Sequence, residues 1–228
     1  MKKSTAIICA YNEAKTIEEI IATVCNYFFD EIIIVNDGST DNTDEILKGM
    51  SANFNFKYIA LPANQGKGFA MATALENAKH QIIVFIDADL TNLNDDHSFE
   101  LINPMINKEA DMVLGQPSET LINYSINPFK SFTGQRALYK ADVLPIVETM
   151  KKSRFGVETL INLFYQSEGK TVKYVMLKEL KHPTKFDKVP KQQAVKEFIK
   201  EGREIALTAF KNFDLVVKSA ETIIRKSL

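Results

Sequence analysis

Short apolar runs alternate with segments of helical period through the first half of the chain, and this alternation restricts the fold more than any other feature. Apolar runs of strand length occupy residues 6–9, 31–35, 56–61, 81–86 and 112–115. Between them, residues 14–27, 41–50 and 68–78 have helical spacing or helix-start signals. Such a β-α-β-α-β-α-β series is typical of a mainly parallel sheet with helices on both faces. We therefore expect an α/β fold.

The second half is less regular and ends in an amphipathic tail. Residues 155–165 are predicted to be a helix, and residues 171–177 a strand. The polar segment 116–132 has no clear period, which is typical of a functional loop. From Lys191 onward, apolar residues recur at helical spacing opposite a lysine-rich face. We expect a domain at 1–188, with halves at 1–115 and 116–188, and a helical extension at 189–228.

Composition excludes several classes of protein. The chain has 228 residues, of which 45% are hydrophobic and 25% charged, so it is neither disordered nor a disulfide scaffold. The net charge of −1 argues against a general polyanion binder, although residues 185–228 carry +4 and the remainder −5. Two cysteines and the lack of a run of about 20 apolar residues predict a cytoplasmic protein.

Polar clusters follow three of the predicted strands. They are Tyr11-Asn12-Glu13, Asn36-Asp37-Gly38-Ser39 and Asp87-Ala88-Asp89. The carboxyl ends of parallel strands share one edge of a sheet, so the three clusters are expected to meet in one crevice. On an extended chain Asp87 and Asp89 would point to the same side, and a divalent cation would relieve their repulsion. Carboxylate ligands suit Mg²⁺ or Mn²⁺.

A glycine-containing turn precedes the third predicted helix. Gly66-Lys67-Gly68 matches neither G-x-x-x-x-G-K-[ST] nor G-x-G-x-x-G. Its backbone N–H groups and Lys67 could still bind an anion at the start of a helix. The alternative is a flexible turn with a solvated lysine.

Together these motifs resemble glycosyltransferase family 2. The resemblance rests on residues 10–13, 35–41, 64–68 and 87–89, in that order and spacing. It implies a GT-A fold, a Rossmann-like sheet, and transfer of a sugar from a nucleotide-sugar donor. It further implies that the donor is bound by Ala10, Tyr11, Glu13, Asp37, Lys67, Asp87 and Ala88. Asp89, with Asp87, would bind the metal.

The second half resembles dolichyl-phosphate-sugar synthases and glucosyl-3-phosphoglycerate synthases. Thr133-Gly134-Gln135-Arg136-Ala137-Leu138-Tyr139 and Gly156-Val157-Glu158 carry this resemblance. It implies acceptor binding by Gly134, Gln135 and Arg136, and catalytic roles for Asp89, Arg136 and Glu158. His182 is positioned like the third metal ligand of the phosphoglycerate enzymes. The chain has no tryptophan, so the Q-x-x-R-W motif of processive polymerases is absent.

The predicted function is a metal-dependent, nonprocessive glycosyltransferase using Mg²⁺ or Mn²⁺. Its donor would be UDP- or GDP-linked, and its acceptor small or lipid-linked, with phosphate-bearing acceptors included. A nucleotidyltransferase and a non-catalytic nucleotide-sugar-binding protein are the alternatives. The tail is expected to pack on its own domain or to form a homo-oligomer. Its alternative is contact with the inner face of the membrane.

Overall fold

A seven-stranded mixed sheet forms the centre of the computed structural model, which describes residues 3–27, 29–118, 133–181 and 191–227. The strand order is β3-β2-β1-β4-β6-β5-β7. The strands are β1 (Ser4–Ala10), β2 (Glu31–Asn36), β3 (Lys57–Ala60), β4 (Ile82–Asp87), β5 (Met112–Pro117), β6 (Arg136–Tyr139) and β7 (Val172–Leu177). All neighbours are parallel except β6, which is antiparallel to both β4 and β5.

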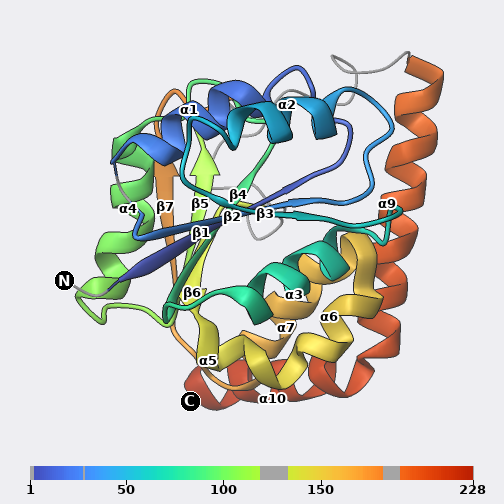
Figure 1. Cartoon of the computed structure of the whole chain (residues 1–228). Coiled ribbons are helices and arrows are strands. Elements are labelled where there is room, and N and C mark those ends of the chain that lie inside the picture. Colours follow the sequence, from blue (N-terminus) through green and yellow to red (C-terminus); the bar gives the residue numbers. More distant parts are fainter. Residues whose placement is uncertain (1–2, 28, 119–132, 182–190, 228) are drawn as a thin grey trace.

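Helices cover both faces of this sheet (Figure 1). One face carries α1 (Ile17–Tyr27), α2 (Thr43–Met50) and α4 (Asp95–Ile106). The other carries α3 (Lys67–Asn77), α5 (Lys140–Val143), η2 (Leu144–Ile146), α6 (Val147–Ser153), η3 (Arg154–Gly156) and α7 (Val157–Ser167). The predicted α/β architecture is confirmed, with β6 as the one strand of opposite direction within the sheet.

A hydrophobic core lies on each face of the sheet. The apolar strands contribute to both cores because successive side chains face opposite sides. Ile8 and Ile34 are fully buried against α1, α2 and α4, whereas Ile7 and Ile33 are buried on the α3 side. Strands buried on both faces read as continuous apolar runs, which is why residues 6–9 and 31–35 show no polar alternation.

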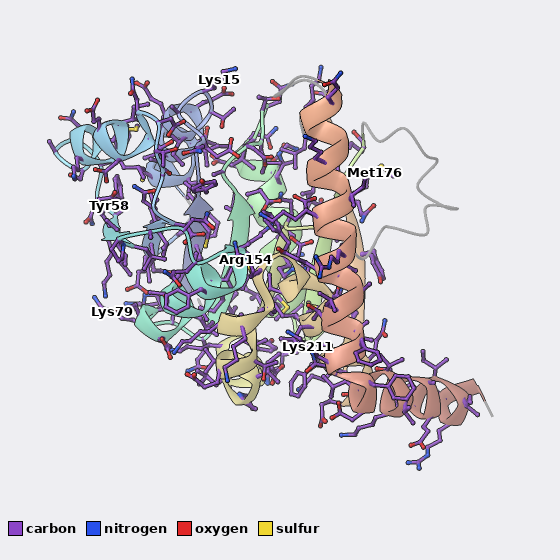
Figure 2. All side chains as sticks on the ribbon, turned by 90° about the vertical axis from the view of Figure 1, so that its right-hand side faces the viewer. Lys15, Tyr58, Lys79, Arg154, Met176 and Lys211 are labelled. Atoms are coloured by element: carbon purple, nitrogen blue, oxygen red, sulfur yellow. The ribbon has the colours of Figure 1, made fainter. Side chains whose placement is uncertain are left out.

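The C-terminal extension forms two helices, α9 (Lys191–Lys211) and α10 (Phe213–Ser227). Figure 2 shows that α10 leaves α9 in a different direction. Thr208 of α9 packs on Gly156, where an added Cβ would lie 1.9 Å from the threonine Oγ1. Ser219 of α10 donates a hydrogen bond to the Leu163 carbonyl of α7 at 3.0 Å. Both helices are therefore seated on the α7 side of the domain.

Among the described residues, no helix combines the length and apolar character needed to cross a membrane.

Candidate active site

Four predicted site segments meet at the carboxyl edge of the sheet. β1, β2 and β4 are adjacent and parallel, so the residues that follow them lie together. The antiparallel β6 then brings its own beginning to the same edge, because Phe85 of β4 is paired with Arg136. The segments after β1, β2 and β4 and the segment before β6 thus form one site.

Asn12 joins the first cluster to the second. It has a left-handed backbone conformation, with φ of 58°. Its Oδ1 accepts a hydrogen bond from the Thr40 backbone N–H at 2.8 Å, and its own N–H donates to Ser39 Oγ at 3.0 Å. Left-handed asparagine is tolerated because its side chain can bond locally. The neighbouring Tyr11 remains 43% exposed at the end of β1.

Asp37 fixes the turn before α3. Its two carboxylate oxygens accept the backbone N–H groups of Gln65 at 2.7 Å and Gly66 at 2.8 Å. Burial raises the pKa of Asp37, while these two hydrogen bonds and the charge of Arg154 act in the opposite direction. The next residue, Gly38, has φ of +66° and its Cβ position lies 2.4 Å from the Ala63 backbone. A side chain there would displace the turn.

A cavity of about 440 Å³ opens beside these segments. It lies at the ends of β1, β2 and β3 and is lined by Tyr11, Asn36, Gly38, Ser39, Thr40, Asp44, Lys48, Ala60, Leu61, Pro62, Ala63 and Asn64. Its volume is within the range of small-molecule sites. Aromatic, amide and hydroxyl groups line the cavity together, a combination suited to a nucleoside.

Lys67 lies between two carboxylates from distant parts of the chain. Its Nζ is 2.7 Å from Asp87 Oδ1 and 2.6 Å from Glu158 Oε1. Burial disfavours the ammonium charge, but the attraction of Asp87 and Glu158 outweighs it, and the pKa of Lys67 is raised. All three side chains are less than one-quarter exposed. The first turn of α3 and the first turn of α7 are therefore joined through the end of β4.

Gln135 and Gly134 hold Asp87 from the side of β6. Gln135 Nε2 donates to Asp87 Oδ2 at 2.7 Å, and Gln135 Oε1 accepts from the Asp87 backbone N–H at 3.1 Å. A Cβ on Gly134 would lie 2.0 Å from Asp87 Oδ2. Both residues were expected to bind an acceptor, and the structure shows them orienting the first carboxylate of the Asp87-Ala88-Asp89 motif.

Arg136 is completely buried, with an exposed fraction of 0%. Its Nη2 donates to the Thr133 carbonyl and its Nη1 to Asn162 Oδ1 at 3.3 Å. Burial lowers the pKa of Arg136, opposed by the charges of Glu158 and Asp87. An acceptor could reach the guanidinium only by displacing this packing.

The Asp87-Ala88-Asp89 segment, predicted to bind the metal, is not an extended strand throughout. β4 ends at Asp87, and Ala88 and Asp89 lie in a turn whose Ala88 carbonyl accepts a hydrogen bond from Thr16 Oγ1 at 2.7 Å. Side-chain alternation along a strand therefore does not direct the two carboxylates to one side, contrary to the prediction. Within residues 3–27, 29–118, 133–181 and 191–227, no group of three or more potential metal ligands comes together. His182 lies outside the described residues.

Sequence reasoning missed Arg154, which contacts the predicted turn at residues 64–68. Asn64 accepts a hydrogen bond from Arg154 Nη2 at 3.3 Å, and Arg154 also packs against Gly66. Arg154 comes from η3, between α6 and α7, and lies just before the Gly156-Val157-Glu158 segment without being part of it. Its proximity to the Asn64–Gly66 turn depends on how α3 packs against α6, so no local signal could have identified it.

The family model for glycosyl transferase family 2 matches residues 5–142. The chain belongs to this family. The matched residues include the Tyr11, Asp37, Lys67 and Asp87 segments and the beginning of β6.

Curated relatives align with about half of the chain. The poly-β-1,6-N-acetyl-D-glucosamine synthase of Staphylococcus epidermidis is 35% identical over 114 residues, which are 49% of this chain and 27% of that protein. The synthase of Staphylococcus aureus strain COL is 32% identical over 115 residues, or 50% and 28%. The match thus spans less than a third of the length of these relatives.

Solved structures with a similar fold align with nearly the whole chain. Glucosyl-3-phosphoglycerate synthase from Mycobacterium tuberculosis, in complex with Mn²⁺, UDP and phosphoglyceric acid, aligns with a TM-score of 0.72 and 19% identity over 92% of this chain and 78% of that one. Its complex with Mg²⁺ and UDP aligns with a TM-score of 0.71 and 20% identity over 92% and 79%. These structures confirm the GT-A fold.

Proposed function

We propose that the protein is a metal-dependent, nonprocessive glycosyltransferase. It would move a sugar from a nucleotide-sugar donor to a small or lipid-linked acceptor, with phosphate-bearing acceptors included. The observation that carries this proposal is the meeting of Asp37, Lys67, Asp87 and Glu158 at one edge of the sheet, beside a cavity of nucleoside size. Membership of glycosyl transferase family 2 supports the reaction class.

The nucleoside of the donor would occupy the cavity at the ends of β1–β3. Tyr11 lines this cavity and offers an exposed ring for stacking, and Ala10 and Glu13 are its neighbours in the sequence. Asp37 would act by holding the Asn64–Gly66 turn in place through its two backbone hydrogen bonds. We propose UDP as the preferred nucleotide over GDP, since the aligned M. tuberculosis synthase structures contain UDP.

Asp87 and Asp89 fit a hard divalent cation by the chemistry of their oxygen ligands. Asp87 already has one oxygen against Lys67 and the other against Gln135, so Asp89 would supply the main protein contact. His182 remains a proposed third ligand. A bound Mg²⁺ or Mn²⁺ would neutralise the negative charge on the departing diphosphate.

Glu158 would act on the acceptor side, and Lys67, its ion-pair partner, on the donor side. The Glu158 carboxylate is 15% exposed at the start of α7 and could take the proton of an acceptor hydroxyl. A phosphate acceptor is already ionised and needs no base, so Glu158 would then only orient Lys67. Arg136 would act indirectly, because its guanidinium holds the Thr133 carbonyl just before Gly134.

The test measures nucleotide binding and turnover separately. UDP with Mn²⁺ should raise the melting temperature, because a ligand that binds only the folded state stabilises it. Asp89→Ala should abolish this shift and the release of UDP from UDP-sugars, while the exposed acid variant Asp96→Ala should retain both. Full turnover of Asp89→Ala, or of wild type in excess chelator, would contradict the proposal.

Processive polymer synthesis is the competing activity, because the staphylococcal relatives are named as polysaccharide synthases. Their identity to this chain is confined to about half its length, and the chain has no tryptophan for a Q-x-x-R-W motif. Mass spectrometry of the products would distinguish the two. A single added sugar supports our proposal, and a ladder of lengths contradicts it.

We also propose that α10 mediates self-association. Phe213, Val217 and Ile224 are 62%, 42% and 60% exposed and follow a heptad-like spacing on one helix. α10 carries the acids Asp214 and Glu221 as well as the basic Arg225, and a mixture of both signs suits a second copy better than an anionic membrane surface. Phe213→Ser with Ile224→Ser should lower the mass in light scattering. An unchanged mass in the double variant, together with loss of binding to vesicles, would instead favour contact of α10 with the inner face of the membrane.

A further inference from the structure

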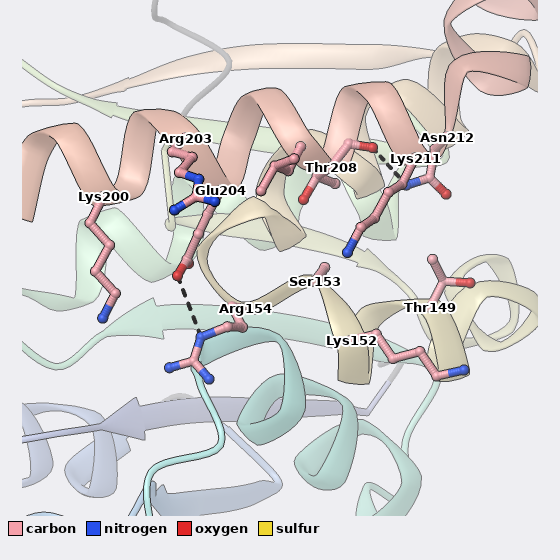
Figure 3. Close-up of a pocket in the computed structure, with 11 residues that line it drawn as sticks. Thr149, Lys152, Ser153, Arg154, Lys200, Arg203, Glu204, Thr208, Lys211 and Asn212 are labelled. Carbon is pink, nitrogen blue, oxygen red and sulfur yellow. Dashed lines mark hydrogen bonds and ion pairs between the residues drawn. The ribbon is translucent and has the colours of Figure 1, made fainter.

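A second cavity, of about 460 Å³, lies between α9 and the α6–η3 segment (Figure 3). It is lined by Thr149, Lys152, Ser153, Arg154, Lys200, Arg203, Glu204, Leu207, Thr208, Lys211 and Asn212. This set shares no residue with the nucleoside-sized cavity at the ends of β1–β3. It is therefore a separate site, which we call the α9 cavity.

The α9 cavity has an excess of positive charge. Lys152, Lys200, Arg203 and Lys211 are exposed cations, and none of them has an ion-pair partner within the part of the chain that the structure describes. Figure 3 shows Lys211 extending from α9 toward Ser153 and Thr149, and Lys200 extending from α9 on the same side of the helix, beyond Arg154. Like charges gathered around one hollow repel one another, and a bound anion would remove that repulsion.

Glu204 does not compensate these charges. Its Oε2 accepts a hydrogen bond from the Phe155 backbone N–H at 3.1 Å, and its Oε1 lies 3.4 Å from Arg154 Nε. Its side chain is only 16% exposed. Glu204 is the single acid of the lining, and it is directed at the η3 turn, so the cations of α9 face the cavity unopposed.

Arg154 links the α9 cavity to the candidate active site. It has φ of 49° and ψ of −121°, a backbone conformation that glycine favours and that costs another residue about 1–3 kcal/mol. In this conformation its guanidinium reaches Asn64 Oδ1 at 3.3 Å and its charge acts on Asp37. Arg154 is strained and contacts both the α9 cavity and the Asn64–Gly66 turn, which points to a functional constraint rather than to packing alone.

We propose that the α9 cavity binds a small phosphate-bearing anion with two or more charges, and that Arg154 transmits its binding to the Asn64–Gly66 turn. Phosphate oxygens match the forked donors of arginine and the ammonium groups of lysine. An anion in the cavity would attract the Arg154 guanidinium away from Asn64. The turn that Asp37 holds would then open more often.

The first experiment measures binding alone, by calorimetry with inorganic tripolyphosphate in the presence of EDTA. The chelator removes divalent cations, so the metal-dependent diphosphate site proposed above does not contribute. Lys200→Glu with Lys211→Glu should weaken binding about tenfold or more, since each charged hydrogen bond contributes about that factor. The matched control, Lys79→Glu with Lys178→Glu, changes the net charge equally at exposed positions outside the cavity.

Equal binding of tripolyphosphate by both double variants would overturn the proposal. Absence of tripolyphosphate binding to the wild type would also overturn it, except where the protein binds phosphate-bearing vesicles instead. Sedimentation with phosphatidylcholine vesicles containing phosphatidic acid forms the second arm. Sedimentation that depends on Lys200 and Lys211, without tripolyphosphate binding, assigns the phosphate to a lipid headgroup. Absence of both binding modes shows that the cations are merely solvated. Circular dichroism confirms that each variant is folded before it is compared.

The link through Arg154 is tested by hydrogen exchange. Tripolyphosphate should speed exchange of the Gln65 and Gly66 amides, which donate to Asp37. Arg154→Gly suits this test because glycine accepts the observed φ without strain. In that variant tripolyphosphate should still bind through Lys200 and Lys211 but leave the two amides unchanged. Unchanged exchange in the wild type would overturn the link, and neither measurement depends on the glycosyltransferase activity.

Discussion

The ammonium group of Lys67 lies 2.6 Å from the carboxylate of Glu158, although the two residues are 91 positions apart in the sequence. Lys67 begins α3 and Glu158 belongs to the first turn of α7, so this ion pair closes the site between two helices that follow different strands. Asp87 shares the same ammonium. Removing Lys67 would leave two neighbouring carboxylates without their counter-charge.

We predict that Lys67→Met lowers the free energy of unfolding by about 1–3 kcal/mol, because two poorly exposed carboxylates lose a charged partner. The pKa of Lys67 is raised, so its contribution is fully present below the ordinary lysine pKa of about 10.4 and is lost only as the pH rises beyond it. Urea denaturation at pH 7 and pH 9 should therefore show the same loss. A loss that vanished between these two pH values would contradict the ion-pair explanation, and Lys67→Arg should recover part of the stability.

Gly134→Ala should disrupt the site through a direct clash. The added Cβ would lie 2.0 Å from Asp87 Oδ2, so either the carboxylate or the turn before β6 must move. We expect a lower melting temperature and loss of UDP binding in the presence of Mn²⁺. Gly202→Ala in α9 is the control: no atom lies within 4 Å of its Cβ position, and alanine should stabilise the helix by about 0.5–1 kcal/mol. Similar behaviour of the two variants would refute the clash.

Arg136→Met tests whether the buried guanidinium holds the structure or contacts an acceptor. We predict a loss of about 2–4 kcal/mol in the free energy of unfolding, since the Thr133 carbonyl and Asn162 lose a charged donor. Arg225→Met, at an exposed position of α10, should change stability by less than about 0.5 kcal/mol. Unchanged stability of Arg136→Met, with a raised acceptor KM, would instead support the acceptor role predicted from the motif.

Both thiols should react slowly with iodoacetamide at pH 8. Burial raises the pKa of Cys9 to about 12 and that of Cys25 to about 11, and only the thiolate is nucleophilic. We expect alkylation in the native protein to be at least about a hundredfold slower than in urea, and slower at Cys9 than at Cys25. With the pKa raised on folding, each thiol's contribution to stability is present below its unfolded pKa of about 8.5 and is lost as the pH rises toward the folded value. Rapid native alkylation at either position would contradict this result.

The strands and helices of the first half could be predicted because each is short, apolar and closed by turn-forming residues. The predicted segment at 31–35 differs from β2 by one residue at its end, and the segment at 68–78 differs from α3 by one residue at each end. The placement of α4 was missed. Its capping box pairs Asn94 with the side chain of His97 rather than with the usual glutamate or glutamine, and Pro104 lies inside the helix. β6 was missed as a strand because only four residues form it.

The positions of Asp37 and Asp87 at one edge could be predicted from strand order, but their partners could not. The hydrogen bonds of Asp37 go to backbone groups, and any sequence could supply those. Gln135 reaches Asp87 only because β6 reverses direction, and the burial of Arg136 follows from the same reversal. Sequence motifs pointed to segments that the structure brings together at one edge of the sheet, whereas the contacts between them depend on tertiary packing.

The reversed direction of β6 also imposes an order on how the protein folds while it is being synthesised. β5 pairs directly with β6 and not with β4, so it cannot join the sheet in its final place until residues 136–139 have left the ribosome. Until then β4, whose residues Ile82–Phe85 are almost entirely apolar, remains an uncovered edge strand. Such an edge is prone to pair with other chains. The nascent protein is therefore most vulnerable to aggregation while its ribosome translates the fifty or so codons between β4 and β6.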